Sequence, residues 1–337
     1  MTGRCAKKCI WLAPLLVVVL LLGGCSEDGE NVRATPAPQA ASTSASPAEI
    51  AVGTGGSRME MREVALYFRM QGENMLAREV RKIYLSRDDQ LEKAIVRAII
   101  DGPSASLLDL SSVFNPGTQV LSTFATGSIL NVTLSREFLS APPDVPANWY
   151  NYAYWREEVM MRRRLAFASV VLAVTDATEY TAVQFLVQER SDDLTGKRIL
   201  RKEIFFDEVD DTAILGPMTR EEGLLLTQYN STQVILESVL EKDLERLYRF
   251  VAQADGERPT QEAFIQAFSE APRALIAFSA APGSVSEDGK TAVMTVDLTF
   301  LDANGTLEIE DYPLHLTREN GLWKIGYATL WRMMEAD

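Results

Sequence analysis

The chain of 337 residues carries 33 basic and 47 acidic residues, a formal net charge of −14 at pH 7. A surface this acidic repels nucleic acid and anionic lipid headgroups, so we expect no nucleic-acid partner. All three cysteines, Cys5, Cys9 and Cys25, lie in the first 25 residues, which excludes a disulfide framework or a cysteine-ligated zinc site from the rest of the chain.

The N-terminal segment, residues 1–24, is typical of a secretory signal peptide. A basic segment precedes an uncharged run at 10–22, which would form about 20 Å of helix at about 1.5 Å per residue. This is too short for a hydrocarbon core of about 30 Å, and small residues follow it where a signal is cut. An ordinary signal peptide with an incidental cysteine, or an uncleaved anchor helix, is the alternative.

The segment ends in the sequence LGGC, formed by Leu22, Gly23, Gly24 and Cys25. This stretch resembles the lipobox of bacterial lipoproteins, in which lipid is attached to the cysteine and cleavage leaves that cysteine as the first residue. The resemblance implies acyl chains such as palmitate on Cys25. Because each buried methylene contributes about 0.8 kcal/mol, more than one chain gives stable anchoring. We therefore expect a lipid anchor on the extracytoplasmic face of the cell membrane.

Residues 25–57 are predicted to form a disordered tether. They are rich in Ala, Ser, Thr, Pro and Gly and contain almost no large apolar side chain. Such a segment cannot bury enough surface to offset its chain entropy. A flexible chain of this length reaches roughly 30 Å, which would hold the folded part away from the membrane.

Residues 58–222 are predicted to form a first α+β domain. The predicted elements are strands at 64–70 and 76–85, a helix ending at 101, strands at 119–125 and 129–134, a helix at about 153–174 and a strand from 181. Ser86 and Asp89, three residues apart, are typical of a capping box at the start of the first helix, and Gly102-Pro103 ends it. This order of elements describes a compact α+β domain.

The stretch 101–138 contains a set of turn and core motif residues: Gly102, Pro103, Pro116, Gly117, Thr118, Leu134, Ser135 and Phe138. With these residues the stretch resembles the core of the GerMN domain of sporulation and spore germination lipoproteins. The resemblance covers about 64–189 and departs at Thr133, where the family commonly has an acidic residue. It implies an α/β sandwich that acts as an envelope-facing interaction domain, with no reaction attached. From the residues alone, the motif positions have structural roles: glycine and proline shape turns, and Phe138 is expected in the core.

Residues 223–337 are predicted to form a second domain of helices on a curved antiparallel sheet. A helical pattern runs from 226 to 251, and strands are predicted at 274–280, 290–301, 306–316 and 321–331, after a helix at 260–269. Asn304-Gly305 is a strong hairpin signal. This order resembles a cystatin-like or nuclear transport factor 2-like fold. Such folds often enclose a pocket, for which the candidate residues are Phe278, Phe300, Trp323, Tyr327 and Trp331; core packing is the alternative.

The aromatic run WYNYAYW, residues 149–155, is a candidate contact site for cell-wall glycan or a protein partner. The candidate residues are Trp149, Tyr150, Tyr152 and Trp155. Helical spacing places Tyr152, Trp155 and Val159 on one face, so core or subunit packing stays open as the alternative.

No catalytic residue, cofactor or metal site is predicted. His315, the only histidine, has no nucleophile at a suggestive spacing. The acidic cluster Asp207, Glu208, Asp210 and Asp211 lacks the alternation and glycine of a calcium loop, which favours a solvated linker.

Two functions therefore stand as hypotheses, and neither is enzymatic. In the first, the protein is an envelope scaffold or interaction module that contacts envelope proteins or itself, linked to sporulation or germination. In the second, it is a binding lipoprotein for a small apolar ligand or cell-wall glycan.

Overall fold

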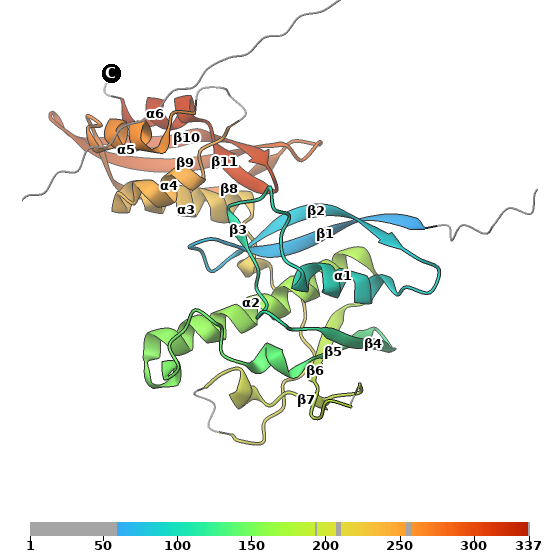
Figure 1. The fold of residues 1–337 in the computed structure, drawn as a ribbon. Helices are drawn as coiled ribbons and strands as arrows, with labels where there is room; N and C mark the ends of the chain where they lie inside the picture. Colours follow the sequence, from blue (N-terminus) through green and yellow to red (C-terminus); the bar gives the residue numbers. More distant parts are fainter. Residues whose placement is uncertain (1–58, 193, 207–209, 254–257, 336–337) are drawn as a thin grey trace, which may run out of the picture. The chain divides into compact units, whose positions relative to one another are not determined.

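The computed structural model describes residues 59–192, 194–206, 210–253 and 258–335 (Figure 1). These residues belong to one compact unit, Gly55–Asp337, and within them lie three sheets and six α-helices. The predicted mixed α+β class is therefore confirmed. The predicted signal peptide, the lipobox with Cys25 and the tether lie outside the described residues. Among the helices that the structure describes, none combines the length and apolar character needed to cross a bilayer.

The first sheet is antiparallel and has the strand order β2-β1-β3. Its strands are β1 (Glu60–Met70), β2 (Leu76–Leu85) and β3 (Leu110–Ser111). β1 and β2 pair from Glu60 opposite Leu85 to Arg69 opposite Leu76, which confirms the first two predicted strands. β3 has only two residues, too few to show an alternation in the sequence.

The second sheet has the order β4-β5-β6-β7 and combines a hairpin with a parallel pair. Its strands are β4 (Val120–Thr126), β5 (Ile129–Leu134), β6 (Ala182–Val187) and β7 (Lys197–Arg198). Gly127, at φ +61°, forms the predicted turn between β4 and β5. β5 and β6 run parallel, so their connection must cross over the sheet, and a helix does this.

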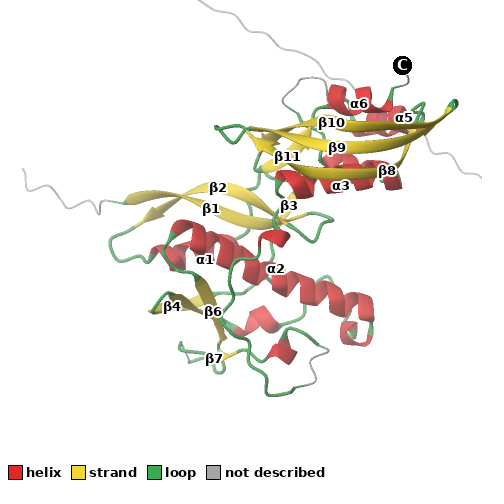
Figure 2. Cartoon of the chain, turned by 180° about the vertical axis from the view of Figure 1, so that it is seen from behind, coloured by secondary structure: helices red, strands yellow, loops and turns green. Residues whose placement is uncertain are grey.

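Helix α2 (Ala153–Ala177) makes that connection and lies between the first two sheets, beside α1 (Leu91–Ile100) (Figures 1 and 2). All ten residues of its run 165–174 are buried, as expected for a helix covered on both sides. The ring of Phe167 lies 5.1 Å from Phe138 and 4.4 Å from Phe185 of β6. The prediction that Phe138 belongs to the core is confirmed.

The start of α1 differs from the prediction. The backbone N–H and the hydroxyl of Ser86 donate to Asp89 at 2.8 and 2.6 Å, but the helix begins at Leu91 with Gln90 as its N-cap. The pair closes a turn before the helix, so the predicted capping box was wrong in position. Gly102, at φ +93°, ends the helix as predicted.

The third sheet is antiparallel with the order β11-β10-β9-β8. Its strands are β8 (Ala274–Val285), β9 (Thr291–Asp302), β10 (Gly305–Glu319) and β11 (Leu322–Ile325). Asp302 pairs with Gly305 across the Asn304-Gly305 turn, which confirms the predicted hairpin. The next hairpin turns at Asn320-Gly321, both with positive φ.

Four helices accompany this sheet: α3 (Gln228–Glu241), α4 (Leu244–Arg249), α5 (Gln261–Ser269) and α6 (Tyr327–Met334). The predicted single helix is broken at Lys242, which is left-handed at φ 59°, and Asp243 caps the new start. The last predicted strand ends at Ile325. Residues from Tyr327 are helical and bury Leu330, Met333 and Met334, a spacing that follows the helical period.

Side chains from the two predicted regions contact each other within the compact unit. Buried Glu73 accepts hydrogen bonds from Arg246 Nε at 2.7 Å and from its Nη2 at 2.8 Å. The Leu226 N–H donates to the Leu76 carbonyl at 2.9 Å. Breaking a buried ion pair is costly, so Glu73 of the first region requires Arg246 of the second.

Candidate functional site

The aromatic run lies at the N-terminal end of α2, where three tyrosines are exposed. Tyr150, Tyr152 and Tyr154 have exposed fractions of 59%, 53% and 68%. Trp149 and Trp155 beside them are half-buried. We call Trp149, Tyr150, Tyr152, Tyr154 and Trp155 the aromatic surface. Tyr154 was not among the predicted contact residues, although it lies in the same run.

The helical-face interpretation of this run was wrong for Tyr152. Trp149–Asn151 forms a 3₁₀ turn, and Tyr152 is the extended N-cap of α2, so it lies outside the helical period. Of the three residues on the expected face, only Val159, nearly two turns inside the helix, is fully buried. The structure thus exposes the three tyrosines and leaves Trp149 and Trp155 half-buried.

Edge-to-face ring contacts hold the aromatic surface in place. The Trp149 ring lies 5.0 Å from Phe206 at 66°, and Tyr154 lies 5.0 Å from Trp155 at 74°. Arg156 Nη1 donates to the Tyr150 carbonyl at 2.9 Å. Such contacts restrict the motion of the Trp149, Tyr154 and Trp155 rings.

Buried Arg163 supports the same region from beneath. Its Nη1 donates to the Glu203 carbonyl and its Nη2 to the Leu139 carbonyl, both at 2.5 Å, and its guanidinium lies 5.3 Å from the Phe206 ring centre. Burial lowers the pKa of Arg163 to about 10. No carboxylate pairs with it among the described residues, so carbonyl dipoles and a ring face replace the counterion.

A charged cluster links α2 to the segment before the aromatic surface. Glu158 accepts from Arg69 Nη1 at 2.6 Å and from Arg162 Nε at 2.6 Å. Arg162 also holds both carboxylate oxygens of Asp144, at 2.6 and 2.7 Å. Burial raises the pKa of Glu158, but the hydrogen bonds from the two arginines outweigh it and lower the pKa from 4.5.

Acid should therefore weaken this cluster. Because the pKa of Glu158 is lower folded than unfolded, its contribution is complete above about pH 4.5 and is lost as the pH falls through the folded pKa. We expect Glu158→Gln to flatten the fall in unfolding free energy below that pH, measured by urea titration at each pH. The exposed neighbour Glu157→Gln is the control. Equal acid dependence in the wild type and Glu158→Gln would contradict the assignment.

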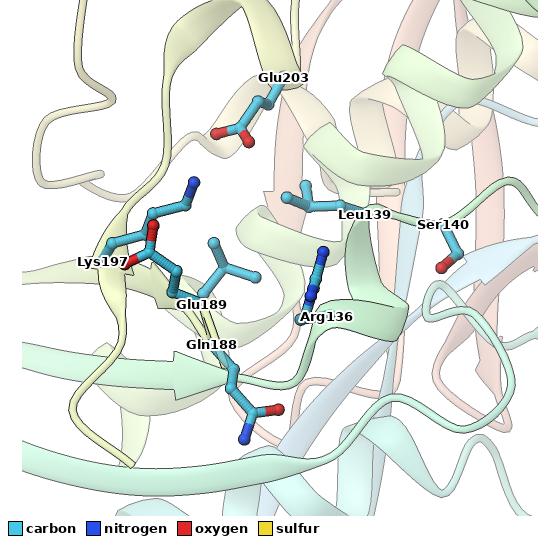
Figure 3. A pocket seen from close by; sticks show the side chains of 8 residues that line it. Arg136, Leu139, Ser140, Gln188, Glu189, Lys197 and Glu203 are labelled. Atoms are coloured by element: carbon cyan, nitrogen blue, oxygen red, sulfur yellow. The ribbon is translucent and has the colours of Figure 1, made fainter. Parts of the chain in front are cut away.

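A polar pocket of about 460 Å³ opens at the carboxyl ends of the parallel strands β5 and β6 (Figure 3). Figure 3 shows the side chains of Arg136, Lys197, Glu189 and Glu203 around it. In open α/β sheets, ligands bind beyond the carboxyl ends of strands, so the location is a favourable one. Two cations and two carboxylates line this pocket, however, so its net charge favours neither an anionic nor a cationic ligand.

The polar pocket shares its wall with the buried arginine network. The Leu139 and Glu203 carbonyls that bind Arg163 belong to residues that line the pocket. The Glu203 carboxylate also accepts the Leu200 N–H at 2.8 Å. Loss of Arg163 would therefore disturb both this pocket and the aromatic surface.

The five candidate aromatics of the second region mostly pack against one another or into the core. Phe300 and Trp323 are buried, and Phe278 is half-buried on β8. Tyr327 and Trp331 lie on α6 instead of a strand, and Trp331 contacts Phe268 edge-on at 5.4 Å. None of the five lines any of the four cavities delineated in the described part of the chain. An apolar pocket here stays a prediction.

The remaining candidates stay apart from one another. His315 is exposed on β10. Asp210 accepts the N–H and hydroxyl of Thr212, both at 2.8 Å, and Asp211 pairs with Lys202 at 3.2 Å. Asp207 and Glu208 lie outside the described residues. Over the residues the structure does describe, no three His, Cys, Asp or Glu side chains gather as metal ligands.

The motif residues of the first region have the structural roles predicted for them. Gly117 adopts φ +83°, and Gly102 likewise has a positive φ. Thr133, the departure from the family pattern, is fully buried, and its hydroxyl donates to the Thr195 carbonyl at 3.2 Å. The Thr133 hydroxyl can donate a hydrogen bond to the Thr195 carbonyl, whereas an ionised carboxylate at this position has no proton to donate and would repel that oxygen.

Several solved structures resemble part of the chain. One contains the tandem GerMN domains of the sporulation protein GerM from Bacillus subtilis, at 12% identity and a TM-score of 0.31, covering 49% of this chain and 46% of that chain. The first GerMN domain of the same protein gives 16% identity and 0.29, covering 47% and 98%. A putative lipoprotein from Clostridium perfringens gives 16% and 0.26, covering 49% and 89%. This chain thus spans less than half of the tandem structure.

No curated protein matches the chain. A protein-family model does match, over residues 65–193: the family Germane, described as sporulation and spore germination. These bounds nearly coincide with the region predicted from the motif residues, and no catalytic family is indicated. Residues 65–193 therefore match the Germane family model, which agrees with the GerMN-like region predicted from the sequence.

Proposed function

We propose that this protein is a non-catalytic interaction module of the cell envelope that binds a protein partner through its aromatic surface. The observation that carries the proposal is the exposure of Tyr150, Tyr152 and Tyr154 together at the start of one helix. Tyrosine and tryptophan are enriched at protein interfaces, where their rigid rings bury much area at low entropic cost.

The surroundings of the aromatic surface support this role. The Trp149 ring contacts Phe206, and the Arg163 guanidinium lies over the Phe206 ring in turn. Aromatic side chains that are already held by neighbouring residues are typical of a preformed interface, because they lose little conformational entropy on binding. Exposed apolar groups are common when scattered, whereas several contiguous rings need an explanation such as a partner.

The proposal includes the lipid anchor predicted at Cys25. Anchored there, with residues 25–57 as a spacer, the module would face envelope proteins from the extracytoplasmic side of the membrane. The Germane match over 65–193 supports a link to sporulation or germination. The partner is then an envelope protein of that process or a second copy of this chain.

Crosslinking on intact cells tests the proposal. We expect tagged full-length protein to give discrete adducts that fall at least about tenfold in a Tyr150→Ala/Tyr152→Ala/Tyr154→Ala variant, because interface rings each contribute about 1–2 kcal/mol. The control is Tyr84→Ala/Leu108→Ala, which removes two other exposed large side chains elsewhere, with exposed fractions of 60% and 81%. A ladder of self-adducts would identify a second copy as the partner. Adducts unchanged by the triple substitution would refute the proposal.

Glycan binding is the second candidate, favoured by the same exposed rings, since aromatic faces stack on sugars. The detergent-solubilised full chain should then be retained on insoluble cell wall, and the triple tyrosine variant should not. Retention together with the absence of protein adducts would replace the interaction module by the binding hypothesis.

A further inference from the structure

A second cavity of about 460 Å³ lies between strand β2 and two turns of the third sheet. Arg78 of β2, Lys290 at the β8–β9 turn and Arg318 of β10 line it. We call the cavity lined by these three cations the basic pocket. Its residues are far apart in sequence, and the cavity contains no part of the aromatic surface or of the polar pocket.

Backbone contacts fix the basic pocket. The Arg318 N–H donates to the Lys290 carbonyl at 2.7 Å. Gly321, at the next turn, approaches β2 so closely that a Cβ on it would lie 1.6 Å from the Arg78 carbonyl oxygen. The three cations are thus positioned by strands and turns that touch, and their convergence does not depend on side-chain freedom.

The two arginines of this pocket have no hydrogen-bonded carboxylate partner among the described residues, whereas Lys290 lies near Asp288. Arg78 and Arg318 are half-buried, and burial together with the positive charge of Arg78 lowers the pKa of Arg318. Among the described residues, neither guanidinium donates to a carboxylate. The Arg318 guanidinium instead lies 5.4 Å from the Trp323 ring centre. Two like charges held together raise the energy of the free protein, and an anion would relieve this.

The two carboxylates that line the same cavity are already satisfied. Glu79 accepts from Arg81 Nε and Nη2, both at 2.8 Å, and from the Ser104 hydroxyl at 2.5 Å. Asp288 accepts from the Ser286 hydroxyl at 2.7 Å and the Lys290 N–H at 3.0 Å. Glu79 is thus paired with Arg81, and the charge of Asp288 offsets that of Lys290, so the arginine pair keeps its positive charge.

We propose that the basic pocket binds the phosphate of a phosphate monoester. Three cations suit a doubly charged oxyanion better than a singly charged carboxylate, and arginine donors match phosphate oxygens in pairs. The Asn320 side chain on the same wall is a further polar group for the ligand. A volume of about 460 Å³ leaves room for the organic group that the phosphate carries. The chain has a net charge of −14, but the positive charge of this pocket would raise the local concentration of an anion.

Calorimetric titration of the detergent-solubilised full chain tests this, with inorganic phosphate and glycerol 3-phosphate as probes at low salt. We expect saturable binding of glycerol 3-phosphate that weakens at least about tenfold in Arg318→Gln and in Arg78→Gln, since each removes a charge-assisted contact. Arg332→Gln, on the exposed face of α6, is the control and should bind as the wild type does.

The source of the phosphate is distinguished by a third arm with micelles containing phosphatidic acid. Binding to those micelles alone assigns the pocket to a lipid headgroup, and binding of glycerol 3-phosphate assigns it to a soluble ester. Without phosphate, Arg78→Gln should melt no lower than the wild type, because it removes a repulsion; this shows that weaker binding is not misfolding. Lack of saturable binding by the wild type to any probe, or equal binding by both arginine variants, would overturn the proposal.

Discussion

Replacing Arg163 by alanine is expected to lower the free energy of unfolding by about 3 kcal/mol. The change leaves the Leu139 and Glu203 carbonyls without their donor, removes the cation above Phe206 and opens a cavity beneath the aromatic surface. It also removes the cost of burying an unpaired charge, which offsets part of the loss. Two lost charge-assisted hydrogen bonds, at about 1.5–3 kcal/mol each, outweigh that relief.

Urea unfolding followed by tryptophan fluorescence measures this loss. The matched control is Arg164→Ala, the next residue, whose partly exposed ion pair with Glu221 should contribute at most about 1 kcal/mol. Arg163→Met restores most of the volume without the donors and should be intermediate. If Arg163→Ala and Arg164→Ala cost the same, the buried arginine has no special structural role.

Gly321→Ala should have an effect of similar size, about 3 kcal/mol, for a different reason. A Cβ at this position would lie 1.6 Å from the Arg78 carbonyl oxygen, a backbone atom that cannot rotate away. The alanine must also adopt φ +82°, which costs roughly 1 kcal/mol for a non-glycine residue. The β10–β11 turn would have to withdraw from β2, and the basic pocket would lose its geometry.

Gly289→Ala separates the two causes. Gly289 also has a positive φ, +67°, but no atom lies within 4 Å of its added Cβ, so we expect a loss of only about 1 kcal/mol. Thermal unfolding of both variants measures the difference. Equal losses would show that backbone strain alone acts and that the contact between Gly321 and Arg78 is unimportant.

Much of the fold could be predicted because the apolar runs and turn residues of the sequence match the burial and turns of the structure. The run 165–174 is apolar on every side, and the helix it forms lies between two sheets. Asn304-Gly305 supplies the positive φ that its hairpin requires. The Germane region was predicted from glycine and proline positions whose turns the structure contains.

The failures come from residues whose environment is set by distant parts of the chain. Arg163 lies in the basic run MRRRL, which is typical of a solvated helix face, yet it is buried by segments near residues 139 and 203. The helical pattern of apolar residues continues through Lys242, so the sequence predicted one helix where the left-handed residue separates α3 from α4. Tyr327 follows a short apolar run that fits strand or helix equally well. The basic pocket joins two arginines from separate strands and a lysine from a turn, which no single stretch of sequence contains.

The two ends of helix α2 differ in burial, and this difference affects which substitutions the protein can tolerate during evolution. Residues 165–174 have neighbours on both sides, so a substitution there changes packing against two sheets at once. The first turn, with Tyr154 and the adjoining tyrosines, faces solvent. Under the proposed function, substitutions at that end would alter which partner is recognised, while residues 165–174 preserve the fold. Single replacements there would then change binding specificity without lowering the stability of the protein.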